Sequence, residues 1–306
     1  MKNRNSLQVI VCSGIIILFV LGTFAQKKRA VSTVKPKTLV FAVLNDGKSL
    51  EPIGQLDKGE LIAVEGDSDQ KSLLSFVKTY YQPKTNYSLI FGGKANGTVT
   101  VNSSNPKSDC GKNLATVTTK SARANLKGNV MGLATNDKIS AAASGVRRLP
   151  TPNERTEIES IVRAEFSKQG VSEDAVKKMD YLNLTALDVD NDGKSELVGT
   201  FWAENSAKER NQLFFIAEQN AVGKYEFGYS DYKKITPGDV MSGELKDLKD
   251  GIGNELLLDV MEYNGDKTAE IFTINQAFEG NNFNVYSRID GKWKKVYEGY
   301  NYHCAY

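Results

Sequence analysis

An acidic loop between two strand-like runs decides how the C-terminal half is interpreted: Leu187-Asp188-Val189-Asp190-Asn191-Asp192-Gly193-Lys194-Ser195-Glu196-Leu197. Acidic residues occupy loop positions 1, 3, 5 and 9, and glycine occupies position 6, where a sharp turn needs it. The flanking runs, Ala186–Leu187 and Leu197–Trp202, are rich in apolar, β-branched and aromatic residues. This pattern predicts two strands joined by a tight acidic turn.

The same loop has the composition of a calcium site, because calcium takes several hard oxygen ligands and a turn can aim several carboxylates inward. An EF-hand is excluded, since it needs glutamate at position 12, where this chain has Gly199, and it needs flanking helices. An acidic, solvated turn without metal is the alternative. The expected ligands are the side chains of Asp188, Asp190, Asp192 and Glu196 and the backbone carbonyl of Lys194.

These residues resemble the strand, acidic loop and strand of FG-GAP and VCBS-type repeats, which are related to the calcium loops of integrin α-chain propellers. The resemblance covers at most about 125 residues from Tyr181 onward, and only the nine-residue loop is specific. It implies Ca²⁺ as the bound ion. A second stretch, Asp247–Glu255, departs from the pattern because Lys249 occupies position 3. We expect that stretch to be a turn without metal.

The strand-like region from Tyr181 onward also suggests an internal repeat. Glu196–Val198 matches Glu255–Leu257 at an offset of 59 residues, and Leu213–Ile216 matches Ile271–Ile274 at an offset of 58. Two four-strand units are the economical explanation. Because a closed propeller takes about four to eight blades, we expect a partial-propeller or sandwich-like β domain instead.

The N-terminal half predicts a small α+β domain over residues 38–134. Apolar and β-branched runs bounded by glycine and asparagine indicate strands, and a helical spacing of apolar residues indicates one helix over Ser68–Gln82 with Ser68 as its cap. The expected strands are Thr38–Val43, Leu61–Val64, Tyr87–Phe91, Gly97–Val101, Ala115–Thr119 and Val130–Ala134. The fold class is therefore mainly β, with an α+β N-terminal domain.

Residues 135–150 lack periodicity and are rich in alanine, serine and asparagine, which predicts a linker. The second domain then spans residues 151–306. It opens with Thr151 as a helix cap, Pro152 in the first turn and Glu154 reaching back to the cap. We expect the helix from Pro152 to Gln169 to cover the β domain with its apolar stripe.

Residues 1–25 have the pattern of a secretory signal peptide: a basic start, an apolar run and the ending Thr23-Phe24-Ala25. A basic lead-in, residues 26–37, follows. We expect cleavage after Ala25, export to the periplasm or the exterior, and no stable membrane span afterwards. An uncleaved N-terminal anchor is the alternative, since about 18 apolar residues can just cross a bilayer.

Charge is unevenly divided between the two halves. Residues 26–150 contain 19 basic and 9 acidic residues, whereas residues 151–306 contain 18 basic and 28 acidic residues. This contrast favours two units. The basic residues are scattered, and export removes most nucleic-acid partners, so we expect no nucleic acid to bind.

After signal cleavage only Cys110 and Cys304 remain, and an oxidising compartment allows them to pair. Sequence spacing does not tell whether their Cα atoms come within bridging distance. The only histidine is His303, which excludes a multi-histidine zinc site. A Ser-His-Asp or Cys-His enzyme would have to depend on the C-terminal tail.

The leading hypothesis is an exported, calcium-stabilised binding or structural module of the cell envelope or exterior, whose partner is an envelope or extracellular protein or a polysaccharide. The sequence contains no catalytic constellation and favours a protein that is not an enzyme. The alternative is a secreted hydrolase that uses a carboxylate pair, which needs no histidine. A third hypothesis is electrostatic attachment, in which the basic half docks on anionic envelope polymers.

Overall fold

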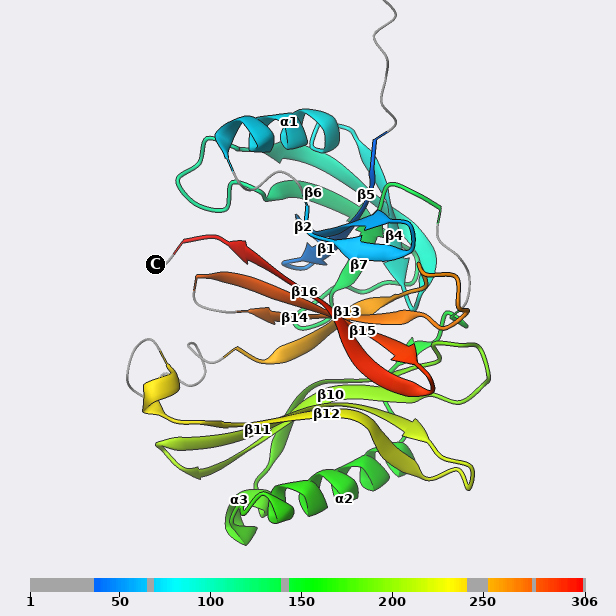
Figure 1. Cartoon of the computed structure of the whole chain (residues 1–306), viewed down its shortest axis with the longest axis vertical. Coiled ribbons are helices and arrows are strands. Elements are labelled where there is room, and N and C mark those ends of the chain that lie inside the picture. Colours follow the sequence, from blue (N-terminus) through cyan, green and yellow to red (C-terminus); the bar gives the residue numbers. More distant parts are fainter. Residues whose placement is uncertain (1–35, 65–68, 139–142, 241–252, 277–278, 305–306) are drawn as a thin grey trace, which may run out of the picture. The chain divides into compact units, whose positions relative to one another are not determined.

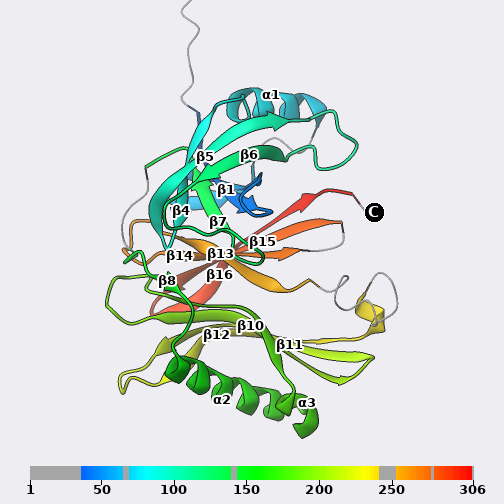
Figure 2. The ribbon, with the colours of Figure 1, turned by 180° about the vertical axis from the view of Figure 1, so that it is seen from behind.

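A computed structural model describes residues 36–64, 69–138, 143–240, 253–276 and 279–304. The fold is mainly β: three antiparallel sheets and few helices make up the described residues (Figures 1 and 2). The predicted signal peptide, most of the basic lead-in and most of the second acidic stretch lie outside the described residues.

Six strands of the N-terminal half close into a barrel in the order β1-β7-β4-β5-β6-β2, because β1 pairs with both β7 and β2. The short strand β3 extends the sheet beyond β2. The bounds are β1 Thr38–Leu44, β2 Ser49–Asp57, β3 Glu60–Ile62, β4 Asn86–Phe91, β5 Lys94–Ser104, β6 Ala115–Lys120 and β7 Gly132–Thr135.

The strand β2 is not among the predicted strands, and it contains Pro52 and Gly54, residues that ordinarily argue against a strand interior. In the structure Pro52 lies opposite Phe41 next to a register shift between Val40 and Phe41. At such an irregularity a missing backbone N–H interrupts the ladder least. Gly54 faces Leu61 so closely that a Cβ at Gly54 would meet the Leu61 side chain at 2.7 Å.

Aromatic and aliphatic side chains fill the barrel, among them Phe41, Tyr81 and Tyr87. The helix α1, Gln70–Tyr80, lies against this core through Phe76. Its cap is Asp69, whose carboxylate accepts hydrogen bonds from the backbone N–H groups of Lys71 and Ser72. The expected cap Ser68 lies outside the described residues.

The segment between the barrel and the next helix contains ordered contacts. Arg147 and Arg148 form β8, which pairs with the strand that follows the helices, and Ala143 is buried. The contacts of residues Pro36–Tyr306 group them into one compact unit. The predicted domain boundaries remain a prediction.

Two helices, α2 (Pro152–Lys168) and α3 (Glu173–Lys177), cover one face of the second sheet. The predicted cap of α2 is confirmed: Thr151 and Glu154 form a reciprocal capping box, and Pro152 is the first helical residue. The apolar stripe of α2 packs on the sheet through Ile158, Val162 and Phe166.

The C-terminal half contains two further antiparallel sheets. The first has the order β12-β11-β10-β9-β8 and the second has the order β13-β14-β15-β16. Their bounds are β8 Arg147–Arg148, β9 Asp180–Leu187, β10 Glu196–Ser206, β11 Glu209–Gln219, β12 Tyr225–Ile235, β13 Glu255–Met261, β14 Glu270–Gln276, β15 Gly280–Ile289 and β16 Lys292–Tyr302, with a 3₁₀ helix η1 at Pro237–Asp239.

Within the β13–β16 sheet, the strands β13, β14 and β15 are buried on both faces, whereas β16 is largely exposed. Leu257 and Val260 pack with residues of the β8–β12 sheet, while Leu256 and Leu258 pack with residues of the barrel. The predicted sandwich-like arrangement with a covering helix is therefore present, and the barrel adds a further layer (Figure 1). Both faces of β1 are also buried, since alternate residues face the barrel interior and the β13–β16 sheet.

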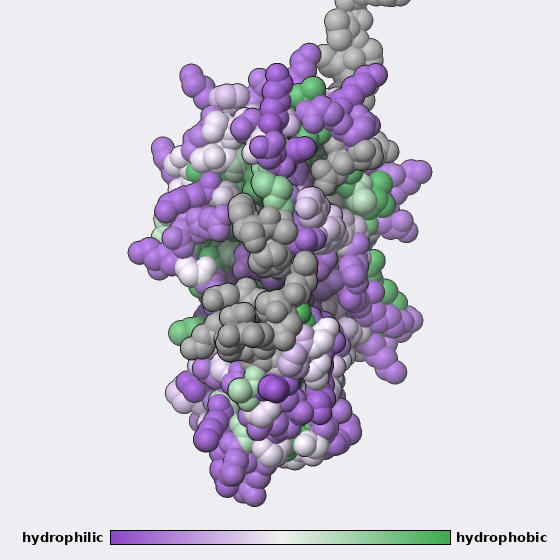
Figure 3. All heavy atoms as spheres, turned by 90° about the vertical axis from the view of Figure 1, so that its left-hand side faces the viewer, coloured by the Kyte–Doolittle hydropathy of each residue, from purple (hydrophilic) through white to green (hydrophobic). Residues whose placement is uncertain are grey.

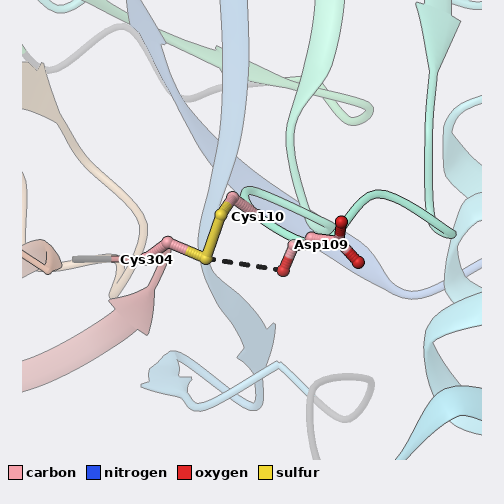
Figure 4. Close-up of a disulfide and its surroundings, with 3 residues drawn as sticks. All are labelled: Asp109, Cys110 and Cys304. Carbon is pink, nitrogen blue, oxygen red and sulfur yellow. Dashed lines mark hydrogen bonds between the residues drawn. A yellow bond between two sulfur atoms is a disulfide. The ribbon is translucent and has the colours of Figure 1, made fainter. Parts of the chain in front are cut away.

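Cys110 and Cys304 form a disulfide with a Cα–Cα distance of 5.2 Å (Figure 4). It joins the loop before β6 to the end of β16. The Sγ of Cys304 also lies 3.5 Å from the carbonyl oxygen of Asp109.

Across the described residues, the helices are too short or too polar to cross a membrane. On the face shown in Figure 3, hydrophilic side chains predominate among the described residues.

Candidate metal centre

The acidic loop connects β9, which ends at Leu187, to β10, which begins at Glu196. Two residues in it adopt the left-handed region, Asn191 at φ 60° and Gly193 at φ 84°. Asparagine and glycine tolerate this conformation best. The turn is closed by side-chain acceptors: Asp192 N–H donates to Asp190 Oδ1 at 3.3 Å, and Lys194 N–H donates to Asp192 Oδ1 at 2.7 Å.

This turn brings three carboxylates together. One oxygen each of Asp188, Asp190 and Asp192 lies within 4.8 Å of the others, in a cluster that could bind a metal ion. Exposure increases along the loop: Asp188 is buried, Asp190 is intermediate and Asp192 is exposed. The cluster is therefore buried at Asp188 and open to solvent at Asp192.

Asp188 carries an unsatisfied oxygen. Its side chain is buried, with 5% of the residue exposed, and Oδ1 has no hydrogen-bond partner among the described residues. A buried polar atom without a partner costs free energy, most of all when it belongs to an ionised group. Three carboxylates that can reach one cation, one of them with an oxygen that no described protein group engages, fit a metal ion.

Neighbouring segments hold the backbone of the loop. Ser144 N–H donates to the carbonyl oxygen of Asp188 at 3.1 Å, and Ala269 N–H donates to the carbonyl oxygen of Val189 at 2.9 Å. The second contact comes from the turn between β13 and β14. The loop is thus held by the segment before β8 and by the turn between β13 and β14.

Glu196 is buried beside the cluster and already has two protein partners. Its Oε2 accepts from Val189 N–H at 3.2 Å, and its Oε1 lies 3.1 Å from Arg288 Nη2. Burial raises the pKa of Glu196 to about 7, against the lowering effect of these partners. The structure does not group Glu196 with the three aspartates, so its role as a ligand remains a prediction.

Lys194 is exposed, and its N–H helps to close the turn. The ligand role of its carbonyl also remains a prediction.

Arg288 is the residue of this site that sequence reasoning missed. It lies on β15 and forms ion pairs with Asp190 at 2.8 Å, Glu196 at 3.1 Å and Glu218 at 3.0 Å. Its guanidinium also lies over the ring of Trp293. No local pattern could have identified it, because it is 98 residues from Asp190 in sequence and reaches the loop from the other sheet.

The turn between β13 and β14 has the same internal bonding as the acidic loop. Glu270 accepts from Tyr263 N–H at 3.2 Å, Asp266 N–H donates to Asn264 Oδ1 at 2.8 Å, and Thr268 N–H donates to Asp266 Oδ1 at 2.7 Å. Each of these bonds has its equivalent in the acidic loop 74 residues earlier, as with Glu196 and Glu270. Sequence spacing could have revealed this second turn.

The predicted offset of 58 to 59 residues does not match equivalent strands. Glu196 begins β10, the strand after the acidic loop, whereas Glu255 begins β13, the strand before its own turn. The strands are all similarly apolar, so an alignment shifted by one strand produces matches of the same quality.

In the β13–β14 turn, the carboxylate of Glu262 accepts from Gly265 N–H at 2.6 Å. Among the described atoms of this turn, no buried side-chain oxygen lacks a hydrogen-bond partner.

The only histidine, His303, binds a carboxylate that does not belong to this cluster. Its Nε2 lies 2.9 Å from Oε1 of Glu51, a fully buried residue of β2 that also accepts from Asn281 and Asn301. These contacts join the end of β16 to the barrel. They give His303 a structural partner in the described part of the chain.

No protein-family model, curated protein or solved structure matches this chain. The likeness of the acidic loop to FG-GAP and VCBS-type repeats therefore rests on the loop residues themselves.

Proposed function

We propose that this protein is an exported binding or structural module of the cell envelope or exterior, stabilised by a calcium ion in the loop from Asp188 to Glu196. The observation that carries the proposal is the cluster of Asp188, Asp190 and Asp192, in which the buried Asp188 also has an oxygen, Oδ1, without a partner among the described residues. A divalent cation there offsets three neighbouring negative charges.

The donor set favours calcium. All three clustered side chains offer carboxylate oxygens, which suit hard cations such as calcium and magnesium, whereas zinc and copper prefer histidine and cysteine. Magnesium requires a smaller, near-octahedral site and gives up its waters reluctantly. An irregular and partly open turn suits calcium better. This assignment agrees with the FG-GAP and VCBS-type resemblance, which we keep as part of the proposal.

Glu196 and Lys194 complete the proposed ligand set. Glu196 would reach the ion by moving one oxygen away from Arg288 or from Val189 N–H, so its contribution is smaller than that of Asp188. Arg288 already supplies one positive charge to Asp190, and it lowers the net charge that draws a cation to the loop. The expected affinity is that of an extracellular module, with a dissociation constant on the order of 10⁻⁴ to 10⁻³ M.

The test is thermal unfolding of the mature chain in chelator and in calcium. At a calcium concentration ten times the dissociation constant, binding to the folded state adds about 1.4 kcal/mol. For a unit of this size, the melting temperature should rise by roughly 3 to 5 °C. Magnesium should raise it less. An identical melt in chelator and in 10 mM calcium would leave the loop as a solvated turn.

Two variants make the test specific. Asp188→Asn keeps the shape of the side chain but removes the buried charge, and it should abolish the calcium increment. Asp266→Asn changes the same kind of turn between β13 and β14, where the Asp266 oxygens are engaged by Thr268 N–H and Asn264. That control should keep the calcium increment, and its loss would place the ion elsewhere.

Export and partner choice have separate tests. The native protein should have an intact mass beginning at Gln26. A mass that retains residues 1–25 would favour the uncleaved anchor.

Salt-sensitive retention on anionic polymers would support electrostatic attachment by the basic half. Turnover in a broad hydrolase screen would favour the carboxylate-pair alternative, for which no described pair of acids stands out.

A further inference from the structure

Arg288 links the acidic loop to strands of both C-terminal sheets. It lies on β15, and its guanidinium pairs with Asp190 of the loop at 2.8 Å, with Glu196 of β10 at 3.1 Å and with Glu218 of β11 at 3.0 Å. The guanidinium also lies 5.0 Å from the centroid of the Trp293 ring on β16. Because an arginine side chain does not deprotonate in proteins, these contacts bring a permanent positive charge to the loop.

The surroundings of Arg288 carry more negative than positive charge. Five acids belong to the cluster or pair with this arginine: Asp188, Asp190, Asp192, Glu196 and Glu218. In the described part of the chain, Arg288 is the one cation that forms an ion pair with any of them. Neighbouring carboxylates repel one another most strongly where the protein partly excludes water. Arg288 is therefore the counter-ion that the protein itself supplies to this loop.

Arg288 and a bound cation draw on the same carboxylate oxygens. Asp190 has both oxygens engaged, since Oδ2 pairs with Arg288 and Oδ1 accepts from Asp192 N–H at 3.3 Å. Glu196 likewise pairs with Arg288 through Oε1 and accepts from Val189 N–H through Oε2. A cation that binds an oxygen held by the guanidinium must move the guanidinium away or lie beside it against the repulsion of like charges.

The contacts of Arg288 divide into two groups. Asp190 and Glu196 belong to the expected ligand set, whereas Glu218 and Trp293 do not. The Oε2 atom of Glu218 accepts from Arg288 at 3.0 Å and from Trp293 Nε1 at 3.1 Å, so the second group is itself bonded together. If Arg288 lost its two loop partners, it would keep one ion pair and one aromatic contact, and its charge would stay partnered.

We propose that Arg288 is an exchangeable counter-ion that sets the calcium affinity of the loop: calcium displaces it from Asp190 and Glu196, and Glu218 and Trp293 retain it. This inference rests on the calcium site proposed above. The loop carboxylates are then neutralised by the arginine when calcium is scarce and by the ion when calcium is abundant. Because calcium must break two ion pairs to bind, the affinity is lower than that of the same loop without the arginine.

The first experiment compares the calcium affinities of Arg288→Gln and the wild type by titration calorimetry at fixed ionic strength. Glutamine removes the charge and keeps a polar side chain. The variant should bind calcium about tenfold more tightly, the scale of removing one nearby exposed charge from a divalent ion. At ten times the wild-type dissociation constant, its rise in melting temperature over chelator should be about twice that of the wild type.

Arg288→Lys separates the charge from the shape of the side chain. Lysine keeps a positive charge near the loop and lacks the planar fork, so this variant should bind calcium much as the wild type does. If Arg288→Lys tightened calcium binding as much as Arg288→Gln, the charge would not be the cause. If both variants bound calcium more weakly than the wild type, Arg288 would instead position Asp190 through its fork. Either result would overturn the exchange.

Arg210→Gln is the matched control. Arg210 has a similar environment, an ion pair with Glu204 at 2.6 Å and a contact with the Trp202 ring at 4.3 Å, and neither partner belongs to the loop. This variant should leave the calcium dissociation constant unchanged. Equal tightening in Arg210→Gln and Arg288→Gln would trace the effect to the net charge of the protein and overturn the role of Arg288.

A readout in the wild type needs no variant to fold. The guanidinium N–H signals of Arg288, assigned by their loss in Arg288→Lys, should shift during the calcium titration with a midpoint at the calorimetric dissociation constant. The signals of Arg210 should stay in place. Arg288 signals that do not move at saturating calcium would refute the displacement.

Failure of this inference and failure of the calcium site give different results. Calcium that binds the wild type, and binds Arg288→Gln no more tightly, refutes the exchange and leaves the site standing. No calcium binding by either chain up to about 10 mM, ten times the weakest expected dissociation constant, refutes both. Binding by Arg288→Gln alone supports the exchange, with the arginine as the stronger of the two cations.

Discussion

Asp259 is a fully buried carboxylate whose oxygens accept hydrogen bonds from several donors. Its oxygens accept from the N–H groups of Gly92 and Gly93 at 3.0 and 3.1 Å, and from Arg147 at 2.7 Å. Gly93 has a φ of 72°, and a Cβ there would crowd Val260, so glycine is required for this approach. A strand of the C-terminal half is thereby attached to a turn of the barrel.

Replacing Arg147 should therefore destabilise the protein strongly. Arg147→Met leaves the Asp259 charge buried and without its ion partner, which typically costs about 3 to 5 kcal/mol. It also removes donors to the carbonyl oxygens of Met131 and Leu258. Urea unfolding measures the loss. The neighbouring Arg148→Met is the control, because its pair with Glu154 is partly exposed and should contribute about 1 kcal/mol or less.

Glu270 makes stability depend on pH. Burial raises the pKa of this carboxyl to about 8, and only 1% of the residue is exposed. Since the folded state then binds the proton more tightly than the unfolded chain, the contribution to stability is complete below about pH 4.5 and is lost as pH rises toward 8. The loss should amount to a few kcal/mol, on the order of 1.4 kcal/mol per unit of pKa shift.

Glu270→Gln should make this dependence shallower and leave the part that comes from Glu196, whose pKa is also raised by burial. The measurement is the free energy of unfolding between pH 5 and pH 9 in chelator. Glu173→Gln, at an exposed position of α3, is the control and should leave the profile unchanged. If the Glu270→Gln variant gave a profile as steep as that of the wild type, the dependence would belong to other groups.

Among the elements, β16 depends on contacts far from it in sequence. It is an edge strand, paired only with β15, and its exposed face includes Tyr300 and Tyr302. The disulfide, the contact between His303 and Glu51, and the hydrogen bond from Tyr297 hydroxyl to the carbonyl oxygen of Ile53 attach it to the barrel. These contacts protect an edge that would otherwise be open to pairing.

Removal of the disulfide should lower stability substantially. The bridge closes a loop of 194 residues, and the chain-entropy argument gives about 5 kcal/mol for a loop of this length, at the top of the range that disulfides typically contribute. Cys304→Ser, Cys110→Ser and the double variant should lose similar amounts, because all three remove the same bridge. Guanidinium unfolding without reductant measures the effect. A double variant as stable as the wild type would contradict it.

At the scale of the molecule, the described layers share their apolar cores. The β13–β16 sheet packs on the barrel on one face and on the β8–β12 sheet on the other. The barrel therefore cannot unfold without exposing apolar side chains of the C-terminal half. The opposite net charges of the two halves also favour their association.

Calorimetric unfolding of a chain that begins at Gln26 should consequently show one transition, with a van't Hoff enthalpy close to the calorimetric enthalpy. Two separate transitions, or independent folding of a fragment comprising residues 38–134, would instead indicate two autonomous domains. This experiment also decides the domain division that the charge contrast predicts.

Several features of the fold follow from residues that are neighbours in the sequence. Thr151, Pro152 and Glu154 specify the start of α2, and the acids at Asp188, Asp190 and Asp192 specify a tight turn between two strands. The mainly β class and most strands of both halves follow from the apolar patterns. In each case the residues that decide the outcome lie close to one another in the sequence.

Tertiary structure alone decided which distant segments meet. Barrel closure depends on β1 pairing with β7, and β2 forms despite Pro52 because its neighbours supply the ladder. Arg288 reaches the acidic loop from another sheet, and Asn113 is left unpaired where the barrel meets β16, among the described residues. An apolar pattern specifies that a face is buried but does not specify its partner, so these contacts could not be read from the chain.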